Sequence, residues 1–216
     1  MLESRIRKIV IGGIFSAVVI VLGTTGLGFI LLPLGAITIL QVPVIIGAIL
    51  EGPVTGLCIG LLFGIFSVIQ AAIMGTSPVD LAFLQYPWIA IVPRILIGPA
   101  AWFVYSLVSG RFFRGKSETG GALEGAAKKG AGLGRETAAT ILGAVTGSLV
   151  NTVLVLSALA LTLPDITWPV VAGLASLNGT VEAGFSAAIS LGVILPWKNL
   201  SRRNGSKLTA TKDHAG

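Results

Sequence analysis

The chain has 216 residues, of which 54% are hydrophobic and only 11% are charged, and its formal net charge is +6. A soluble domain carries roughly 25% charged residues, so the surplus apolar surface is expected to face lipid. The basic residues flank apolar segments and form no basic, aromatic-rich face, which excludes a nucleic-acid-binding protein.

Six apolar segments are predicted to cross the membrane as helices, each of which needs about 20 mostly apolar residues. The start of the chain is basic, as in a signal peptide, but no convincing small-residue cleavage site follows, so the first helix is expected to be retained. The second helix is short because the turn Glu51-Gly52-Pro53 ends it. The expected helices are approximately 8–30, 34–50, 54–74, 86–108, 137–162 and 168–196.

The positive charges predict the orientation of these helices. All Lys and Arg residues except Arg94 lie at the N-terminus, in a loop of about 109–136, or in the C-terminal tail. With six spans these three segments fall on one side, and the loops on the other side carry no Lys or Arg. Because excess Lys and Arg marks the cytoplasmic side, we expect an all-α, integral membrane bundle with both termini inside.

The chain is expected to form one membrane domain, residues 1–200, followed by a basic cytoplasmic tail. The loop 109–136 is rich in Gly, Ala and charged residues, which favours a flexible cytoplasmic segment. The tail 201–216 is expected to be disordered. On the outer side, Gly75, Ser77 and Pro78 in the loop 75–85 are compatible with a mobile lid.

The sequence offers no site for nucleotide or metal chemistry. Residues 110–117 match the literal P-loop pattern, but that motif needs a preceding strand and a following helix, and here a membrane helix and a Gly-rich loop are expected. The one cysteine, Cys58, lies in an apolar helix, and the one histidine, His214, lies in the tail. With no catalytic constellation and no cluster of carboxylates, we expect neither a cofactor nor an enzyme.

Polar residues on four predicted helices indicate a binding site. At 1.5 Å per residue, Arg94, Asn151 and Asn178 lie roughly 9–15 Å below the outer surface. Glu182 follows Asn178 by four residues and shares its helix face, and Gln70 reaches a similar layer. A charged group at a helix centre costs about 2.5–3.5 kcal/mol, which simple helix packing does not require. These residues are therefore predicted to line a solute site that opens outward.

The side chains indicate the class of solute. The planar guanidinium of Arg94 suits a carboxylate or a phosphate, and the amides of Asn151 and Asn178 suit amide and hydroxyl groups. Glu182 accepts hydrogen bonds from such groups or balances the charge of Arg94. The combination predicts a small, polar, anionic organic solute. The alternative is structural, with Arg94 paired to Glu182 and the asparagines bridging helices.

Small residues on the first helix form two pairs at a spacing of four, Gly12 with Ser16 and Gly13 with Ala17. This spacing lets a second helix approach closely. Packing within the protein and docking of a partner subunit both agree with the pattern.

Several segments together match a known family. They are the run Val42–Leu50 with Gly52-Pro53, the run Pro93–Gly98, the pair Asn151-Thr152, and the pair Asn178-Gly179 with Glu182. Over about residues 5–196, the chain resembles the substrate-binding S components of energy-coupling factor (ECF) vitamin transporters.

The resemblance implies a subunit that binds a vitamin or a precursor from outside, in the plasma membrane of a prokaryote. It also implies docking on a shared membrane coupling subunit that two ATP-binding subunits drive, with Gly13 and Ala17 on the docking face. The chain looks most like the pantothenate-associated group, with folate, pyridoxine-type and hydroxymethylpyrimidine-type solutes as alternatives. Gln41 stands where many relatives have His, which leaves the solute open. The alternative function is an autonomous, ion-coupled transporter or channel.

Overall fold

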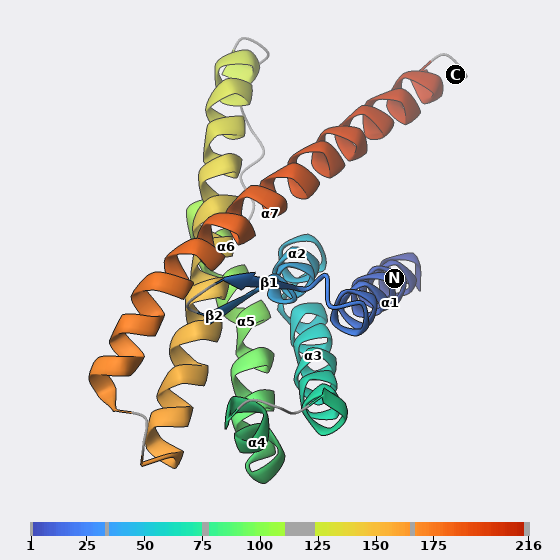
Figure 1. The fold of residues 1–216 in the computed structure, drawn as a ribbon. Helices are drawn as coiled ribbons and strands as arrows, with labels where there is room; N and C mark the ends of the chain where they lie inside the picture. Colours follow the sequence, from blue (N-terminus) through green and yellow to red (C-terminus); the bar gives the residue numbers. More distant parts are fainter. Residues whose placement is uncertain (1, 33–34, 75–77, 111–123, 165–166, 214–216) are drawn as a thin grey trace.

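The computed structural model describes residues 2–32, 35–74, 78–110, 124–164 and 167–213. Figure 1 shows a bundle of helices with one short β-hairpin beside α2. Five of the helices are long and apolar enough to cross a membrane, so the predicted helical membrane bundle is confirmed at this level. The elements are α1 (Leu2–Thr24), β1 (Phe29–Leu32), β2 (Gly35–Thr38), α2 (Gln41–Glu51), α3 (Pro53–Met74), α4 (Pro78–Gln85), α5 (Pro87–Val108), α6 (Glu124–Thr162) and α7 (Trp168–Asp213).

The predicted second helix, 34–50, is wrong in its first part. Strands β1 and β2 pair antiparallel, with Phe29 opposite Thr38, and α2 begins only at Gln41. The first helix also ends early, since α1 stops at Thr24 and Gly26 then adopts a positive φ of 72°. A short apolar run suits a strand as well as a helix, and its periodicity does not separate the two.

Three other segments differ from the expected loops. The segment 75–85 contains helix α4, and Gly75 and Ser77 lie outside the described residues. Helix α6 begins at Glu124, so 124–136 are helical, and α7 continues to Asp213. Most of the P-loop-like segment lies outside the described residues. The division into a membrane domain and a tail stays a prediction.

Helix α2 is the centre of the bundle. All of its residues from Gln41 to Ile49 are buried, and it packs against α1, α3, α5, α6 and α7. Its side chains Ile45 and Ile49 join Phe63 of α3 and Ile97 of α5 in the main apolar core. By contrast, the long helices expose many large apolar side chains, as expected of surfaces that face lipid.

Helices α3 and α5 touch along their backbones. A Cβ added at Gly60 would lie 2.2 Å from the carbonyl oxygen of Arg94, and one at Gly56 would lie 2.9 Å from the Cα of Gly98. Small residues at intervals of four allow such close packing. This contact fixes the height and rotation of α5, and therefore the position of Arg94.

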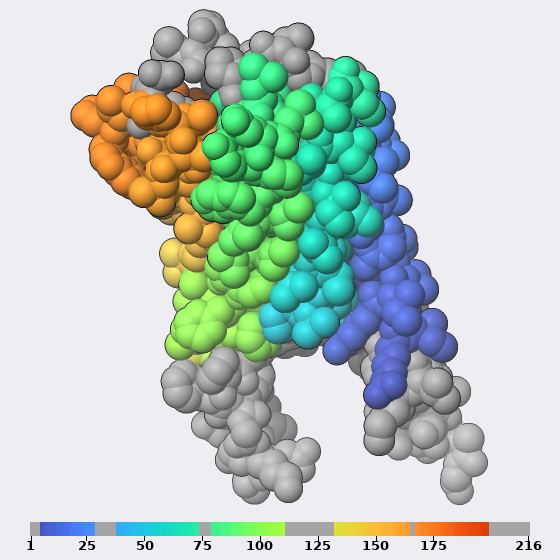
Figure 2. All heavy atoms as spheres, turned by 90° about the horizontal axis from the view of Figure 1, so that it is seen from below, coloured from blue at the N-terminus to red at the C-terminus, as the bar shows by residue number. Residues whose placement is uncertain are grey.

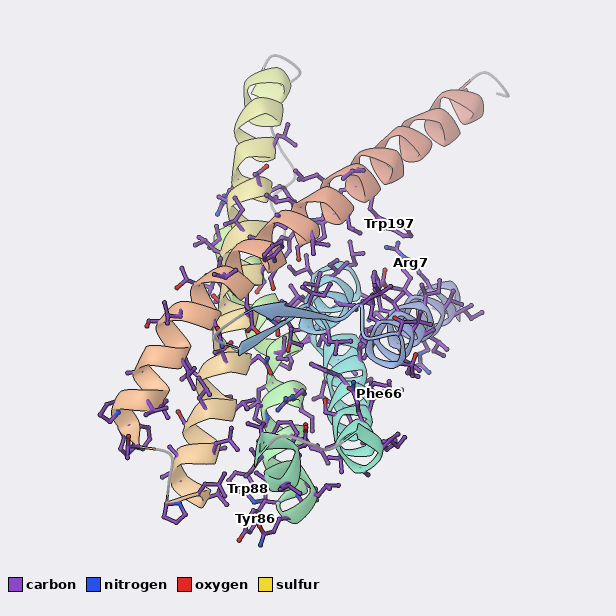
Figure 3. The ribbon with its side chains drawn as sticks, viewed as in Figure 1. Arg7, Phe66, Tyr86, Trp88 and Trp197 are labelled. Atoms are coloured by element: carbon purple, nitrogen blue, oxygen red, sulfur yellow. The ribbon has the colours of Figure 1, made fainter. Side chains whose placement is uncertain are left out.

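The two ends of the bundle are distinct. Figure 2 shows α1, α3 and α5 side by side, with the N-terminal end of α1 and the C-terminal end of α5 at the same end. The opposite end carries α4 and the start of α7. Tyr86 and Trp88 lie beside α4 at that end, and Trp197 lies toward the other (Figure 3). Aromatic residues at both ends agree with interfacial belts.

Candidate functional site

A network of hydrogen bonds centred on Gln41 joins α2 to α6 and α7. The Gln41 side chain is fully buried. Its Nε2 donates to Oγ of Ser148 at 2.8 Å and lies 3.5 Å from Oγ of Ser186. Its Oε1 accepts from Nδ2 of Asn151 at 2.9 Å. The amide of Gln41 therefore uses both of its ends within the protein.

A second set of contacts surrounds Glu182 and holds the hairpin. The backbone N–H of Thr38 donates to Glu182 Oε1 at 2.9 Å, and Thr152 Oγ1 donates to Glu182 Oε2 at 2.8 Å. Glu182 lies four residues before Ser186 on α7, and Thr152 follows Asn151 on α6. The two networks consequently form one polar layer between the hairpin, α2, α6 and α7.

Arg94 lies on α5 between two aromatic rings. Its Cζ is 5.6 Å from the ring centroid of Phe63 and 4.9 Å from that of Phe83. Cations within about 6 Å of such rings are attracted by the ring electrons. Nη1 donates to the carbonyl of Ile89, one turn nearer the start of α5, at 3.2 Å. The guanidinium thus points toward the end of the bundle that carries α4.

Arg94 and Glu182 do not form the direct pair that the structural alternative required. The charge of Glu182 acts on Arg94 through space. Within the described part of the chain, however, no carboxylate oxygen lies within 4.0 Å of the guanidinium. Arg94 is only 7% exposed, so it is a buried cation whose nearest neighbours are rings and a carbonyl group.

Two groups of this region lack hydrogen-bond partners among the described residues. They are Nε of Arg94 and Oδ1 of Asn151, and both atoms are buried. Buried polar groups without partners are rare in proteins and costly. One is a donor with positive charge and the other is a neutral acceptor. The first suits an anionic group and the second suits a hydrogen-bond donor.

The other predicted site residues lie apart from these contacts. Gln70, on α3, donates through Nε2 to the carbonyl of Gly23 at 3.2 Å, which ties α3 to the end of α1. Asn178 is half-buried one turn before Glu182 on α7. The structure therefore gives Gln70 a partner on α1 and leaves Asn178 at the edge of the polar layer.

Sequence reasoning did not identify Gln41, Thr38, Ser148, Thr152 and Ser186 as members of the site. The hydroxyl groups of Ser148, Thr152 and Ser186 are common in membrane helices and carry no distinctive signal, and Thr38 takes part through its backbone N–H. Gln41 does carry a signal in the sequence, because burying an amide side chain at the start of an otherwise apolar run costs free energy unless the amide has hydrogen-bond partners.

The predicted docking residues face away from the bundle. Gly13 has no atom within 4 Å of a Cβ position, and Ala17 is exposed. By contrast, a Cβ at Gly12 would lie 3.5 Å from Cγ2 of Thr55 on α3. The pair Gly12 and Ser16 therefore lies toward α3, and the pair Gly13 and Ala17 is left uncovered by the described residues.

Comparisons with known proteins identify the family of the chain. The family model described as "ECF transporter, substrate-specific component" matches residues 7–196. The pantothenic acid transporter PanT of Lactococcus lactis subsp. cremoris (strain MG1363) is 33% identical over 137 residues, which cover 57% of this chain and 56% of the relative. The match thus spans little more than half of the relative's length. The resemblance predicted from the sequence motifs is confirmed.

Proposed function

Because the chain belongs to the family of ECF transporter substrate-specific components, we propose that it captures a water-soluble vitamin for an ATP-driven importer, with pantothenate as the first candidate. The family consists of transport proteins, which agrees with the prediction that the chain is not an enzyme. The proposed solute site is the region between Arg94 and the polar layer around Gln41.

The observation that carries this proposal is the buried guanidinium of Arg94. Removing a cation from water costs free energy, and an opposite charge must offset that cost. Two aromatic rings, one carbonyl group and the more distant charge of Glu182 supply only part of the offset. A solute carboxylate between Arg94 and the polar layer would complete it, with the planar fork of the guanidinium binding both oxygens.

The hairpin supports a site at membrane depth. Helix α2 has 11 residues and is therefore about 16 Å long, which is too short to cross a hydrocarbon core of about 30 Å. The antiparallel hairpin does not lengthen that crossing, because Ile39 bonds back to Gly28, and it lies beside the start of α2. Non-helical backbone at such depth is tolerated where it is buried in protein or lines a cavity. Its contact with Glu182, 14 residues into α7, puts it beside the polar layer.

The chemistry of the solute follows from the donors and acceptors. Pantothenate carries a carboxylate for Arg94, and its two hydroxyls and amide N–H can donate to Asn151, Asn178 or Glu182. The named relative is a pantothenic acid transporter. Folate, pyridoxine-type and hydroxymethylpyrimidine-type solutes are the alternatives, of which only folate offers a carboxylate to Arg94.

The orientation we propose is N-in and C-in, with six crossings of the plasma membrane of a prokaryote. Helix α2 and the segment that leads into it from α1 form the second crossing. The N-terminal end of α1 and the C-terminal end of α5, which both adjoin basic segments, lie at one end of the bundle (Figure 2). That end is then cytoplasmic, and the polar layer opens to the other side.

The partners we propose are a membrane coupling subunit and two ATP-binding subunits. The uncovered small residues Gly13 and Ala17 on α1 provide the docking face, since a helix without side-chain bulk allows close approach. The energy source then lies outside this chain.

Thermal unfolding of the purified protein in detergent tests the proposed function. A solute that binds the folded state raises the melting temperature through mass action. At a solute concentration one hundred times Kd, the free energy of unfolding increases by about 2.7 kcal/mol. We expect pantothenate to stabilise the protein and biotin to leave it unchanged. If another vitamin stabilises the protein and pantothenate does not, that vitamin replaces pantothenate as the proposed solute. If no vitamin stabilises the protein, the proposal is contradicted.

A further inference from the structure

Gln41 determines how Asn151 faces the proposed solute site. The side chain of Gln41 is enclosed on all sides, with 0% exposure, and it contacts α6 and α7 but not the guanidinium of Arg94. Asn151 has one of its two polar atoms, Nδ2, bonded to Gln41 at 2.9 Å. The other atom, Oδ1, is buried and has no partner among the described residues.

The direction of each hydrogen bond follows from Gln41. A serine hydroxyl can donate or accept, so Ser148 and Ser186 do not by themselves fix the direction of the glutamine amide. The amide of Gln41 also interacts as a donor with the carboxylate of Glu182, which can only accept, so Nε2 faces this side. With Nε2 on the serine side, Oε1 faces Asn151 and can only accept. Asn151 must then turn its Nδ2 toward Gln41, which leaves its carbonyl oxygen on the opposite side.

We propose that Gln41 is a positioning residue that presents Oδ1 of Asn151 as an acceptor, so that the protein selects a solute with a hydrogen-bond donor, a hydroxyl or an amide N–H, at this point. This inference rests on the proposed function, and it adds that the protein accepts and the solute donates the hydrogen bond at Asn151. If Asn151 presented Nδ2 in place of Oδ1, this donor would lie against the donor of the solute and repel it. An isolated asparagine would adapt to either polarity, because its amide can rotate by half a turn.

Binding affinities of four compounds test the proposal, measured by calorimetry on the full chain in detergent. They are pantothenate and three analogues of similar shape, each of which lacks one hydrogen-bond donor. In the first a ketone replaces the 2-hydroxyl group, in the second fluorine replaces the 4-hydroxyl group, and in the third an ester replaces the amide. For the wild type we expect one analogue to bind about tenfold or more weakly than pantothenate, the effect of one lost hydrogen bond. In Gln41→Met, Asn151 is free to rotate, and that ratio should fall below about threefold.

A matched control is Ser190→Ala. Ser190 lies one turn beyond Ser186 on α7, is fully buried, and has no hydrogen-bond partner among the described residues. Its hydroxyl forms no hydrogen bond with Gln41, so its variant should keep the wild-type ratio. If Gln41→Met fails to fold, Ser148→Ala replaces it, because loss of the 2.8 Å anchor also frees the Gln41 amide.

The outcomes separate this inference from the proposed function. If the wild type binds pantothenate but none of the analogues is weakened, or if Gln41→Met weakens all four compounds equally, the inference is overturned and the proposed function stands. Equal weakening is the result of a purely structural role. If the wild type binds none of the compounds, pantothenate recognition and this inference are both contradicted.

Discussion

Gly60 of α3 lies directly against the carbonyl group of Arg94 on α5. The distance from an added Cβ to that oxygen would be 2.2 Å, and the obstacle is backbone that cannot rotate away. The residue proposed to bind the solute is thus held in place by a glycine on the neighbouring helix. The hydrogen bond from Arg94 to Ile89 and the ring of Phe63 then orient the side chain.

Gly60→Ala should therefore push α5 away from α3. Overpacking of this kind costs typically about 1–3 kcal/mol, and the displaced Arg94 should weaken solute binding as well. Melting temperature and solute affinity of the purified protein measure the two effects. Gly13→Ala, which adds the same methyl group where no atom lies within 4 Å, should change neither. Equal stability of the two variants would mean that α3 and α5 are not in close contact.

Gly13→Trp should spare solute binding and block uptake. The bulky ring would cover the proposed docking face on α1, which lies away from the polar layer. Solute binding in detergent and uptake by cells that contain the coupling and ATP-binding subunits measure the two properties. Gly184→Trp on α7 is the matched control, since Gly184 is also exposed with no atom within 4 Å, and it should permit uptake. Uptake by cells that contain the Gly13→Trp variant would show that this face of α1 is not the docking surface.

Glu182→Leu should loosen the hairpin from α7. The backbone N–H of Thr38 and the hydroxyl of Thr152 would both lose their acceptor. Leaving a buried donor unsatisfied costs about 1–3 kcal/mol, so we expect a fall in melting temperature and increased proteolysis between α1 and α2. Glu182→Gln keeps one acceptor oxygen and should lie between Glu182→Leu and the wild type. A Glu182→Leu protein as stable as the wild type would show that this tether contributes nothing.

Much of the helical framework could be predicted from the sequence, because long apolar segments have few alternatives in a membrane. The segments predicted as 54–74 and 86–108 agree closely with α3 and α5. The hairpin could not be predicted, because residues 29–38 are as apolar as a helix would be. Its strands depend on contacts with α7 that are distant in sequence, such as Thr38 with Glu182.

The candidate site was predictable only in part. Arg94, Asn151 and Glu182 stand out because polar groups in apolar helices need a reason to be there. Depth along a helix does not determine the direction of a side chain, however. The sequence could not show that Gln70 bonds to α1, and its role in the site stays a prediction. Gln41 was seen only as a replacement for His, because its partners Ser148 and Ser186 are more than 100 residues away in sequence.

The affinity of the protein for pantothenate and for pantothenol, in which a neutral alcohol replaces the carboxylate, tests the proposed role of Arg94 most directly. Two unit charges at 4 Å attract by about 4 kcal/mol at an effective dielectric constant near 20. We therefore expect the wild type to prefer pantothenate by about a hundredfold or more, and Arg94→Gln to bind both compounds with similar affinity. A wild type without this preference, or an Arg94→Gln variant that retains it, would contradict the proposed site.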